Sequence, residues 1–150
     1  MQNILGENDR LAAENQAMFQ EKGVFVVNLM GSPGSGKTSL LEKTLEAIAG
    51  EMQLAVIEGD LFTHKDAARI EPLGIPVIQI NTAGGCHLDA PMVQKVAKKL
   101  DLDSLELLIV ENVGNLVCPA EFAVGENEKA VVLSITEGAD KPMKYPLIFK

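Results

Sequence analysis

Short apolar runs alternate with amphipathic stretches along most of the chain. The apolar runs have strand length and are rich in Val, Ile and Leu: "VFVVNLM" (24–30), "LAVIE" (54–58), "PVIQI" (76–80), "LLIVE" (107–111) and "AVVLSI" (130–135). Helical spacing is found between them, at 39–49, 65–71 and 90–100. Strands that are apolar on both faces and alternate with helices are typical of a parallel sheet covered on both sides. The pattern predicts one α/β domain over residues 1–150, without repeats or a linker.

The first 22 residues form a polar segment that favours a helix. Its apolar positions fall loosely on one side of a helix over Asn3–Glu21, namely Ile4, Leu5, Leu11, Ala12, Met18 and Phe19. We expect a helical arm here. The pattern leaves open whether it docks on the domain or projects from it.

Unusual segments follow the predicted strands: "GSPGSGKT", "GDLFTHKD", "NTAGGCHLD" and "NVGNLVCP". Right-handed crossovers place the carboxyl ends of parallel strands along one edge of the sheet. Ligands of open α/β sheets bind outside those ends. The sequence therefore predicts that its chemistry lies along one edge.

The segment "GSPGSGKT" (31–38) matches the phosphate-loop pattern G-x-x-x-x-G-K-[ST], with a predicted strand before it and a helix after it. Gly34 and Gly36 permit the backbone to turn its N–H groups toward phosphate oxygens. Lys37 is expected to reach the β- and γ-phosphates, and Thr38 to bind Mg²⁺. A simple glycine-rich turn at a helix start does not explain the lysine, the threonine and both flanks together. The predicted nucleotide-binding residues are Gly31, Ser32, Pro33, Gly34, Ser35, Gly36, Lys37, Thr38, Ser39 and Gly114.

Two acidic residues lie at the ends of predicted strands, Asp60 and Glu111, and we expect both to be near this loop. A carboxylate at the end of a buried strand needs a partner, which Mg²⁺ supplies, although a capping role is an alternative for either one alone. With Lys37, they are the candidate catalytic residues. Nearby polar residues fit a γ-phosphate sensor or a solvated helix face equally well: Thr63, Asp66 and Arg69.

The composition of the chain limits the kinds of molecule that it is expected to bind. Apolar residues make up 47% and charged residues 23% of the chain, as in ordinary globular proteins. The formal net charge is −8 and no Lys/Arg cluster occurs, which argues against nucleic-acid binding. No apolar run is long enough to span a membrane, and the N-terminus lacks the pattern of a signal peptide, so we expect a cytoplasmic protein with reduced cysteines.

Both cysteines, Cys86 and Cys118, lie in predicted loops at the sheet edge, and His87 adjoins the first. Thiolate and imidazole select Ni²⁺, Zn²⁺ and Cu⁺, whereas a free cysteine is also a common small core residue. Cys86 and His87 are expected to point to different sides of an extended segment. A four-ligand site is then completed more easily by two chains around a twofold axis. His64 is isolated and is interpreted as a surface residue.

Five segments together resemble the nickel-incorporation GTPases of hydrogenase maturation (the HypB family). They are "NLMGSPGSGKTSLL", "VIEGD", "QINTAGGCHLDA", "IVENVGNLVCPAEF" and "SITEGADKPMKYPLIF", in this order and across nearly the whole chain from Val24 on. The resemblance implies a phosphate-loop GTPase that couples hydrolysis of GTP to GDP with nickel delivery to the large subunit of [NiFe]-hydrogenase, with a maturation partner. It also implies a metal site for Ni²⁺ or Zn²⁺ formed by Cys86, His87 and Cys118 at a GTP-promoted homodimer interface.

Two features depart from the family pattern. The first 23 residues contain no His or Cys, so a nickel-storage segment is not expected there. The family continues past "KYPLIFK" into a strand ending in N-K-x-D, which reads guanine, while the sequence stops at Lys150. We therefore expect a truncated family domain whose guanine preference rests on resemblance alone.

Three alternatives remain at this stage. A urease-type nickel GTPase shares the architecture, but we expect a Cys-Pro-His motif there instead of "GGCHLD". A phosphate-loop kinase needs an arginine-bearing lid, for which Arg69 is the sole candidate near the edge. A metal-binding dimerisation module without catalysis is the third.

Overall fold

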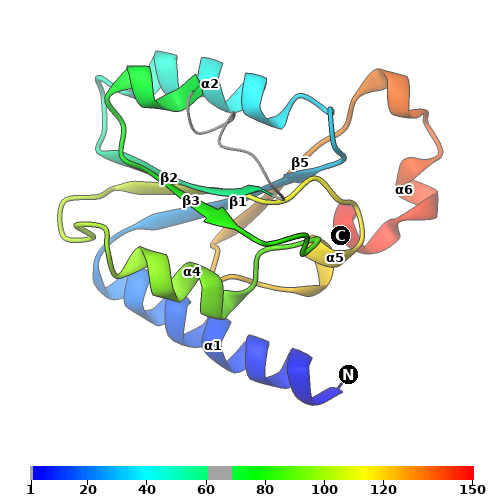
Figure 1. The fold of residues 1–150 in the computed structure, drawn as a ribbon, viewed down its shortest axis with the longest axis horizontal. Helices are drawn as coiled ribbons and strands as arrows, with labels where there is room; N and C mark the ends of the chain where they lie inside the picture. Colours follow the sequence, from blue (N-terminus) through cyan, green and yellow to red (C-terminus); the bar gives the residue numbers. More distant parts are fainter. Residues whose placement is uncertain (1, 61–68) are drawn as a thin grey trace.

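The computed structural model describes residues 2–60 and 69–150, and its strands form a parallel sheet (Figure 1). The strand order is β3-β2-β4-β1-β5. The strands are β1 (Phe25–Gly31), β2 (Leu54–Asp60), β3 (Val77–Asn81), β4 (Leu107–Glu111) and β5 (Glu128–Val132). All neighbouring pairs are parallel, so the carboxyl ends of the strands share one edge. The predicted α/β fold is confirmed.

Helices cover both faces of the sheet (Figure 1). Helix α2 (Lys37–Ile48) packs on one face, where Leu41 and Leu45 join the apolar side chains of β1, β2 and β4. Helices α1 (Gln2–Glu21) and α4 (Ala90–Ala97) lie against the other face, with Phe19 and Val93 in its core. The three inner strands, β1, β2 and β4, are therefore covered from both sides, as their continuous apolar sequences require, whereas the edge strands β3 and β5 are only partly buried.

Helix α1 is docked on the domain through two of the predicted apolar residues, Ala12 and Phe19, and through two asparagines. The buried positions are Asn8, Ala12, Asn15 and Phe19, whereas Ile4 is 66% exposed. Asn8 donates to the carbonyl of Ala123 and accepts from the N–H of Ala90, both at 2.9 Å. Asn15 donates to the carbonyls of Ala90 and Val124, also at 2.9 Å. Because these amides bind backbone groups at the start of α4 and in the loop at residues 123–124, polar residues occupy a helix face where apolar ones were expected.

The last strand begins and ends earlier than predicted. β5 covers Glu128–Val132 instead of 130–135, because Ser134 caps the 3₁₀ helix η2 (Ile135–Glu137) and leaves the sheet. The N–H of Ser134 donates to Glu137 Oε2 at 2.6 Å. Besides η2, the short elements not predicted from the sequence are η1 (Glu71–Leu73), α5 (Cys118–Glu121), α6 (Lys141–Lys144) and η3 (Pro146–Phe149). Most of the helix predicted over 65–71 lies outside the described residues.

Residues 2–60 and 69–150 contain no helix that combines the length and the apolar character needed to cross a membrane.

Candidate functional site

The phosphate loop connects β1 to α2 and opens toward a cavity at the carboxyl edge of the sheet. Gly34 and Gly36 have φ angles of 71° and 99°, which favour glycine. Gly36 is the N-cap of α2 and offers no side chain to the first N–H groups of the helix. A helix N-terminus without a side-chain cap presents donors and a positive dipole end to an anion. The loop is thus shaped to hold phosphate.

The cavity in front of the loop measures about 390 Å³, a volume typical of small-molecule sites. Its lining brings together most of the predicted nucleotide-binding residues with the end of β4. The lining residues are Pro33, Gly34, Gly36, Lys37, Thr38, Ser39, Gly59, Arg69, Glu111, Asn112, Val113 and Gly114. Of the other predicted contacts, Gly31 ends β1 and Ser35 is buried. Ser32 hydrogen-bonds Glu137, which lowers the pKa of that carboxyl group.

Lys37 is held along the loop and not in solvent. Its side chain is buried, and Nζ donates to the carbonyls of Gly31 and Ser32, each at 3.1 Å. These contacts keep a positive charge beside the uncapped N-terminus of α2, in a protein of net charge −8. Charge-assisted hydrogen bonds to phosphate oxygens are available to such a group.

Thr38 and Glu111 meet, as the magnesium prediction requires. Thr38 Oγ1 donates to Glu111 Oε1 at 2.6 Å, and both residues are buried. The second oxygen of this carboxylate, Oε2, is buried without a hydrogen-bond partner. A buried acceptor of this kind is suited to a metal ion or a metal-bound water. Asp60 ends β2, but its side chain lies outside the described residues, as do Thr63, His64 and Asp66.

A second buried carboxylate, Glu58, was missed from the sequence. Glu58 lies directly opposite Glu111 in the β2–β4 register and is 1% exposed. Because residues 54, 56 and 58 share one face of the strand, Glu58 shares the α2 side of the sheet with Leu54 and Val56. The signal available in the sequence was an acid placed inside an apolar strand, two residues before Asp60.

Arg69 is engaged by helix α2. Its Nε donates to Glu42 Oε2 at 2.9 Å, and its guanidinium also donates to Ser39 Oγ at 3.2 Å. Arg69 also lines the cavity at the phosphate loop, so both interpretations of this residue, the γ-phosphate sensor and the solvated helix face, stay predictions.

Replacing Gly114 by alanine should weaken nucleotide binding at least tenfold with a small effect on folding. A Cβ at this position would lie 2.9 Å from the Cα and N of Pro33, so the 112–116 segment and the phosphate loop would have to separate. The measurement is nucleotide affinity by calorimetry beside thermal unfolding. Gly50→Ala is the matched control, because a Cβ there meets nothing within 4 Å. Equal affinities in both variants would contradict the prediction.

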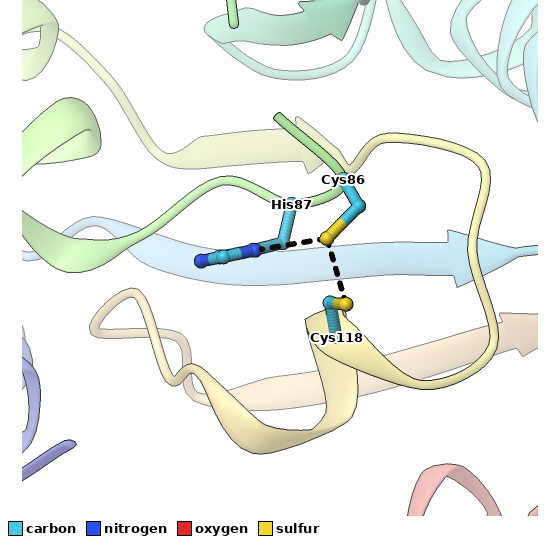
Figure 2. A group of neighbouring side chains, drawn as sticks. All are labelled: Cys86, His87 and Cys118. Carbon is cyan, nitrogen blue, oxygen red and sulfur yellow. Dashed lines mark hydrogen bonds between the residues drawn. The ribbon is translucent and has the colours of Figure 1, made fainter. Parts of the chain in front are cut away.

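The cysteines and His87 form a compact group within one chain (Figure 2). Cys86 Sγ lies 2.7 Å from Cys118 Sγ and 3.5 Å from His87 Nδ1, and all three donor atoms lie within 4.8 Å of one another. The expectation that Cys86 and His87 point apart is wrong, because the segment bends before Leu88 and is not extended. A single chain therefore supplies three ligands of the type that binds Ni²⁺ or Zn²⁺.

The surroundings of this group set its protonation. The His87 ring stacks on Phe122, with centroids 4.0 Å apart, and burial lowers the pKa of His87. A neutral imidazole keeps a lone pair for a metal. The hydrogen bond with Cys86, followed by burial, raises the pKa of Cys118 to about 11. Metal binding at neutral pH must then release a proton from this thiol.

In metal-free protein, Cys118 should be alkylated by iodoacetamide about 100-fold more slowly at pH 8 than an ordinary thiol. The thiolate is the nucleophile, and a pKa of about 11 in place of 9.0 keeps the thiol protonated as the pH rises through 9. Mass spectrometry of the Cys118 peptide gives the rate. Cys86→Ala removes the hydrogen bond and should raise that rate, so an unchanged rate would show that Cys86 does not control the thiol.

Comparison with known proteins identifies the family. Residues 25–137 match the family described as CobW/HypB/UreG, nucleotide-binding domain. The chain belongs to the CobW/HypB/UreG family. Its phosphate loop, β4 and the Cys86–Cys118 group all lie within the matched residues of this family domain. This match, together with the relatives and solved structures described below, confirms the resemblance inferred from the motifs.

Curated CobW/HypB/UreG relatives are similar over nearly the whole chain. The hydrogenase maturation factor HypB of Azotobacter vinelandii is 58% identical over 148 residues, which cover 99% of this chain and 49% of the relative. The factor of the same name from Escherichia coli K12 is 54% identical over 146 residues, which cover 97% of this chain and 50% of the relative. The chain thus spans about half the length of these relatives.

Solved structures of the family are also similar. HypB from Helicobacter pylori in complex with nickel superposes with a TM-score of 0.89 at 41% identity, covering 95% of this chain and 67% of that one. HypB from Archaeoglobus fulgidus gives a TM-score of 0.88 at 44% identity, and the superposition covers 96% of this chain and 70% of the A. fulgidus chain.

Proposed function

We propose that this chain is the GTP-binding and GTP-hydrolysing part of a cytoplasmic metallochaperone that inserts nickel during [NiFe]-hydrogenase maturation. The observation that carries the proposal is the pairing of two sites on one sheet edge. Lys37, Thr38 and Glu111 face the cavity at the phosphate loop, and Cys118 lies seven residues after Glu111 in sequence. The names of the curated relatives and the nickel in the H. pylori structure support this proposal.

In this proposal, the phosphate loop binds and orients the triphosphate. The N–H groups of residues 34–38 and Lys37 Nζ neutralise the negative charge of the phosphates. Phosphoryl transfer is catalysed mainly by positioning the phosphates and stabilising their charge in this way. Thr38 Oγ1 and Glu111 would hold Mg²⁺, directly or through water, and Asp60 is the further candidate ligand. The bound ion supplies charge neutralisation at the phosphates. The unpartnered Glu111 Oε2 fits this assignment.

Nickel is the cargo and not a resident cofactor in this proposal. Cys86, His87 and Cys118 supply three soft ligands at partly exposed positions, which leaves room for a fourth ligand from another molecule. We propose that this ligand comes from a second copy in a GTP-promoted homodimer, and that a maturation partner and the hydrogenase large subunit then receive the metal. Zn²⁺ suits the same ligands and is the competing ion.

Glu111→Gln should remove the magnesium-dependent part of GTP affinity and lower hydrolysis at least 100-fold, because the amide still accepts from Thr38 but carries no charge. Nucleotide affinity is measured with Mg²⁺ and with EDTA, and hydrolysis by phosphate release. Glu106→Gln is the matched control, since Glu106 is an exposed carboxylate that precedes β4. If the wild-type chain binds nickel but hydrolyses no nucleotide, the non-catalytic metal-binding module replaces this proposal.

A further inference from the structure

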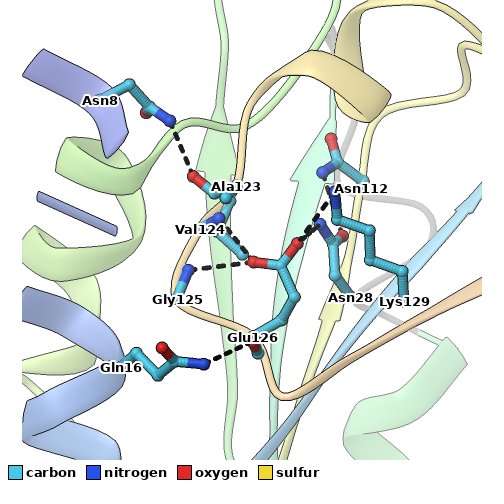
Figure 3. Close-up of polar contacts among 9 residues, drawn as sticks. All are labelled: Asn8, Gln16, Asn28, Asn112, Ala123, Val124, Gly125, Glu126 and Lys129. Atoms are coloured by element: carbon cyan, nitrogen blue, oxygen red, sulfur yellow. Dashed lines mark hydrogen bonds and ion pairs between the residues drawn. The ribbon is translucent and has the colours of Figure 1, made fainter. Parts of the chain in front are cut away.

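A buried carboxylate, Glu126, lies outside both sites described above (Figure 3). Its Oε2 accepts from the N–H groups of Val124 and Gly125 at 2.7 and 3.0 Å, and its Oε1 accepts from Asn28 Nδ2 at 3.3 Å. Lys129 Nζ lies 3.8 Å from Oε1. An ionised carboxylate only accepts hydrogen bonds. The Glu126 carboxylate therefore accepts three hydrogen bonds, from Val124, Gly125 and Asn28, and it cannot become a donor to any of them.

The polarity of Glu126 fixes the orientation of two buried amides. Asn28 turns its NH₂ group to Glu126, so its Oδ1 faces the other way and accepts from Asn112 Nδ2 at 3.1 Å. Asn112 thereby presents Oδ1 to two backbone donors, the N–H groups of Leu88 and Val113, both at 2.9 Å. Asn28 is fully buried and Asn112 is 1% exposed, so water does not offer either amide an alternative partner.

The two backbone donors belong to the two candidate sites. Leu88 directly follows His87, and its side chain is buried against Gly59. Val113 lines the cavity at the phosphate loop, next to Gly114. One side-chain oxygen thus anchors the loop that carries Cys86 and His87 and the segment that faces the nucleotide.

We propose that Glu126, Asn28 and Asn112 form a directional hydrogen-bond relay in which Asn112 is a positioning residue for both sites. The metal part of this inference rests on the proposed nickel site. Partners that orient metal ligands typically change metal affinity 10–100-fold. Since Asn112 acts through the backbone of Leu88, the lower end of that range applies here.

The polarity of the relay gives a test with four proteins: wild type, Glu126→Gln, Asn28→Asp and the double variant. In Glu126→Gln, the single oxygen is taken by the two short bonds from Val124 and Gly125, so the new NH₂ group faces Asn28 Nδ2. Asn28 must then reverse, and the reversal passes to Asn112. In Asn28→Asp, two carboxylates face each other in the core.

The double variant restores the hydrogen bonds that join positions 126, 28 and 112, although the ion pair between Lys129 and position 126 is lost. The glutamine introduced at position 126 accepts from the turn and donates to the aspartate introduced at position 28. That aspartate accepts from Asn112, so Asn112 again presents its oxygen to Leu88 and Val113. Both single variants should weaken nickel binding about tenfold and speed amide exchange at Leu88 and Val113. The double variant should return both readouts to within about twofold of wild type. Glu128→Gln, an exposed change of the same charge on β5, should alter neither.

Nickel affinity is measured by titration and amide exchange by NMR, both at a temperature where thermal unfolding shows every variant folded. Single variants that keep wild-type affinity and exchange would overturn the relay, as would a double variant no better than the singles. A wild-type chain that binds no nickel would contradict the proposed function, while the exchange data still decide the relay. Slow exchange of the Asn28 and Asn112 side-chain NH₂ groups is expected in wild type, and fast exchange would overturn the relay even if a single variant fails to fold.

Discussion

Alanine at position 37 should lower the affinity for GTP at least about 100-fold while the chain remains folded. Hydrogen bonds to a charged group contribute about 1.5–3 kcal/mol each, and Lys37 offers its charge beside the uncapped start of α2. The fold should tolerate the change, because the carbonyl of Gly31 also accepts from the N–H of Asn115 at 3.0 Å. Calorimetric titration with GTP and thermal unfolding provide the two readouts.

Lys43→Ala is the matched control for this experiment. Lys43 lies on the same helix and carries the same charge, but it is exposed and pairs with Glu46 at 2.6 Å. The Lys43→Ala variant should keep a GTP affinity within about twofold of wild type. Equal losses in both variants would mean that the helix, and not the phosphate-loop charge, determines binding. Undiminished affinity in Lys37→Ala would remove Lys37 from the site.

The fold and the phosphate loop were predictable because their signals are local. Apolar strands at regular intervals leave few topologies once crossovers are right-handed, and the loop pattern combines glycine, lysine and threonine at fixed positions. The contact of Thr38 with Glu111 follows from the same reasoning, since residues after one strand meet the end of its neighbour.

The rest depends on tertiary contacts that no local pattern specifies. Asn8 and Asn15 read as solvent-facing helix residues, yet each bonds backbone groups that are distant in sequence. The same holds for Asn28 and Asn112, whose role depends on the register of β1 and β4. The prediction that the side chains of Cys86 and His87 point apart was wrong because it assumed an extended segment, whereas the chain bends before α4.

A continuous set of hydrogen bonds connects the phosphate loop to Cys118. The carbonyl of Gly31 accepts from Lys37 Nζ and from the N–H of Asn115, and Gly31 and Asn115 form an isolated antiparallel bridge. The side chain of Asn115 in turn accepts from the N–H groups of Val117 and Cys118, at 2.7 and 3.2 Å. A nucleotide that draws Lys37 toward its phosphates therefore acts on the carbonyl of Gly31, which also binds Asn115 and so the segment that leads to Cys118.

We accordingly expect nickel affinity to differ about 5–150-fold between the GDP state and a non-hydrolysable GTP state with Mg²⁺, the range typical of coupled sites. Linkage requires nickel to change the GTP-to-GDP affinity ratio by the same factor, which gives an independent check. Asn115→Ala should reduce the difference toward unity while nickel still binds, because it removes the bonds to Val117 and Cys118 and leaves the three ligands. Cys118→Ala should instead lose most of the nickel affinity in both states. Equal nickel affinities in the two nucleotide states of the wild-type chain would show that the sites are neighbours without coupling.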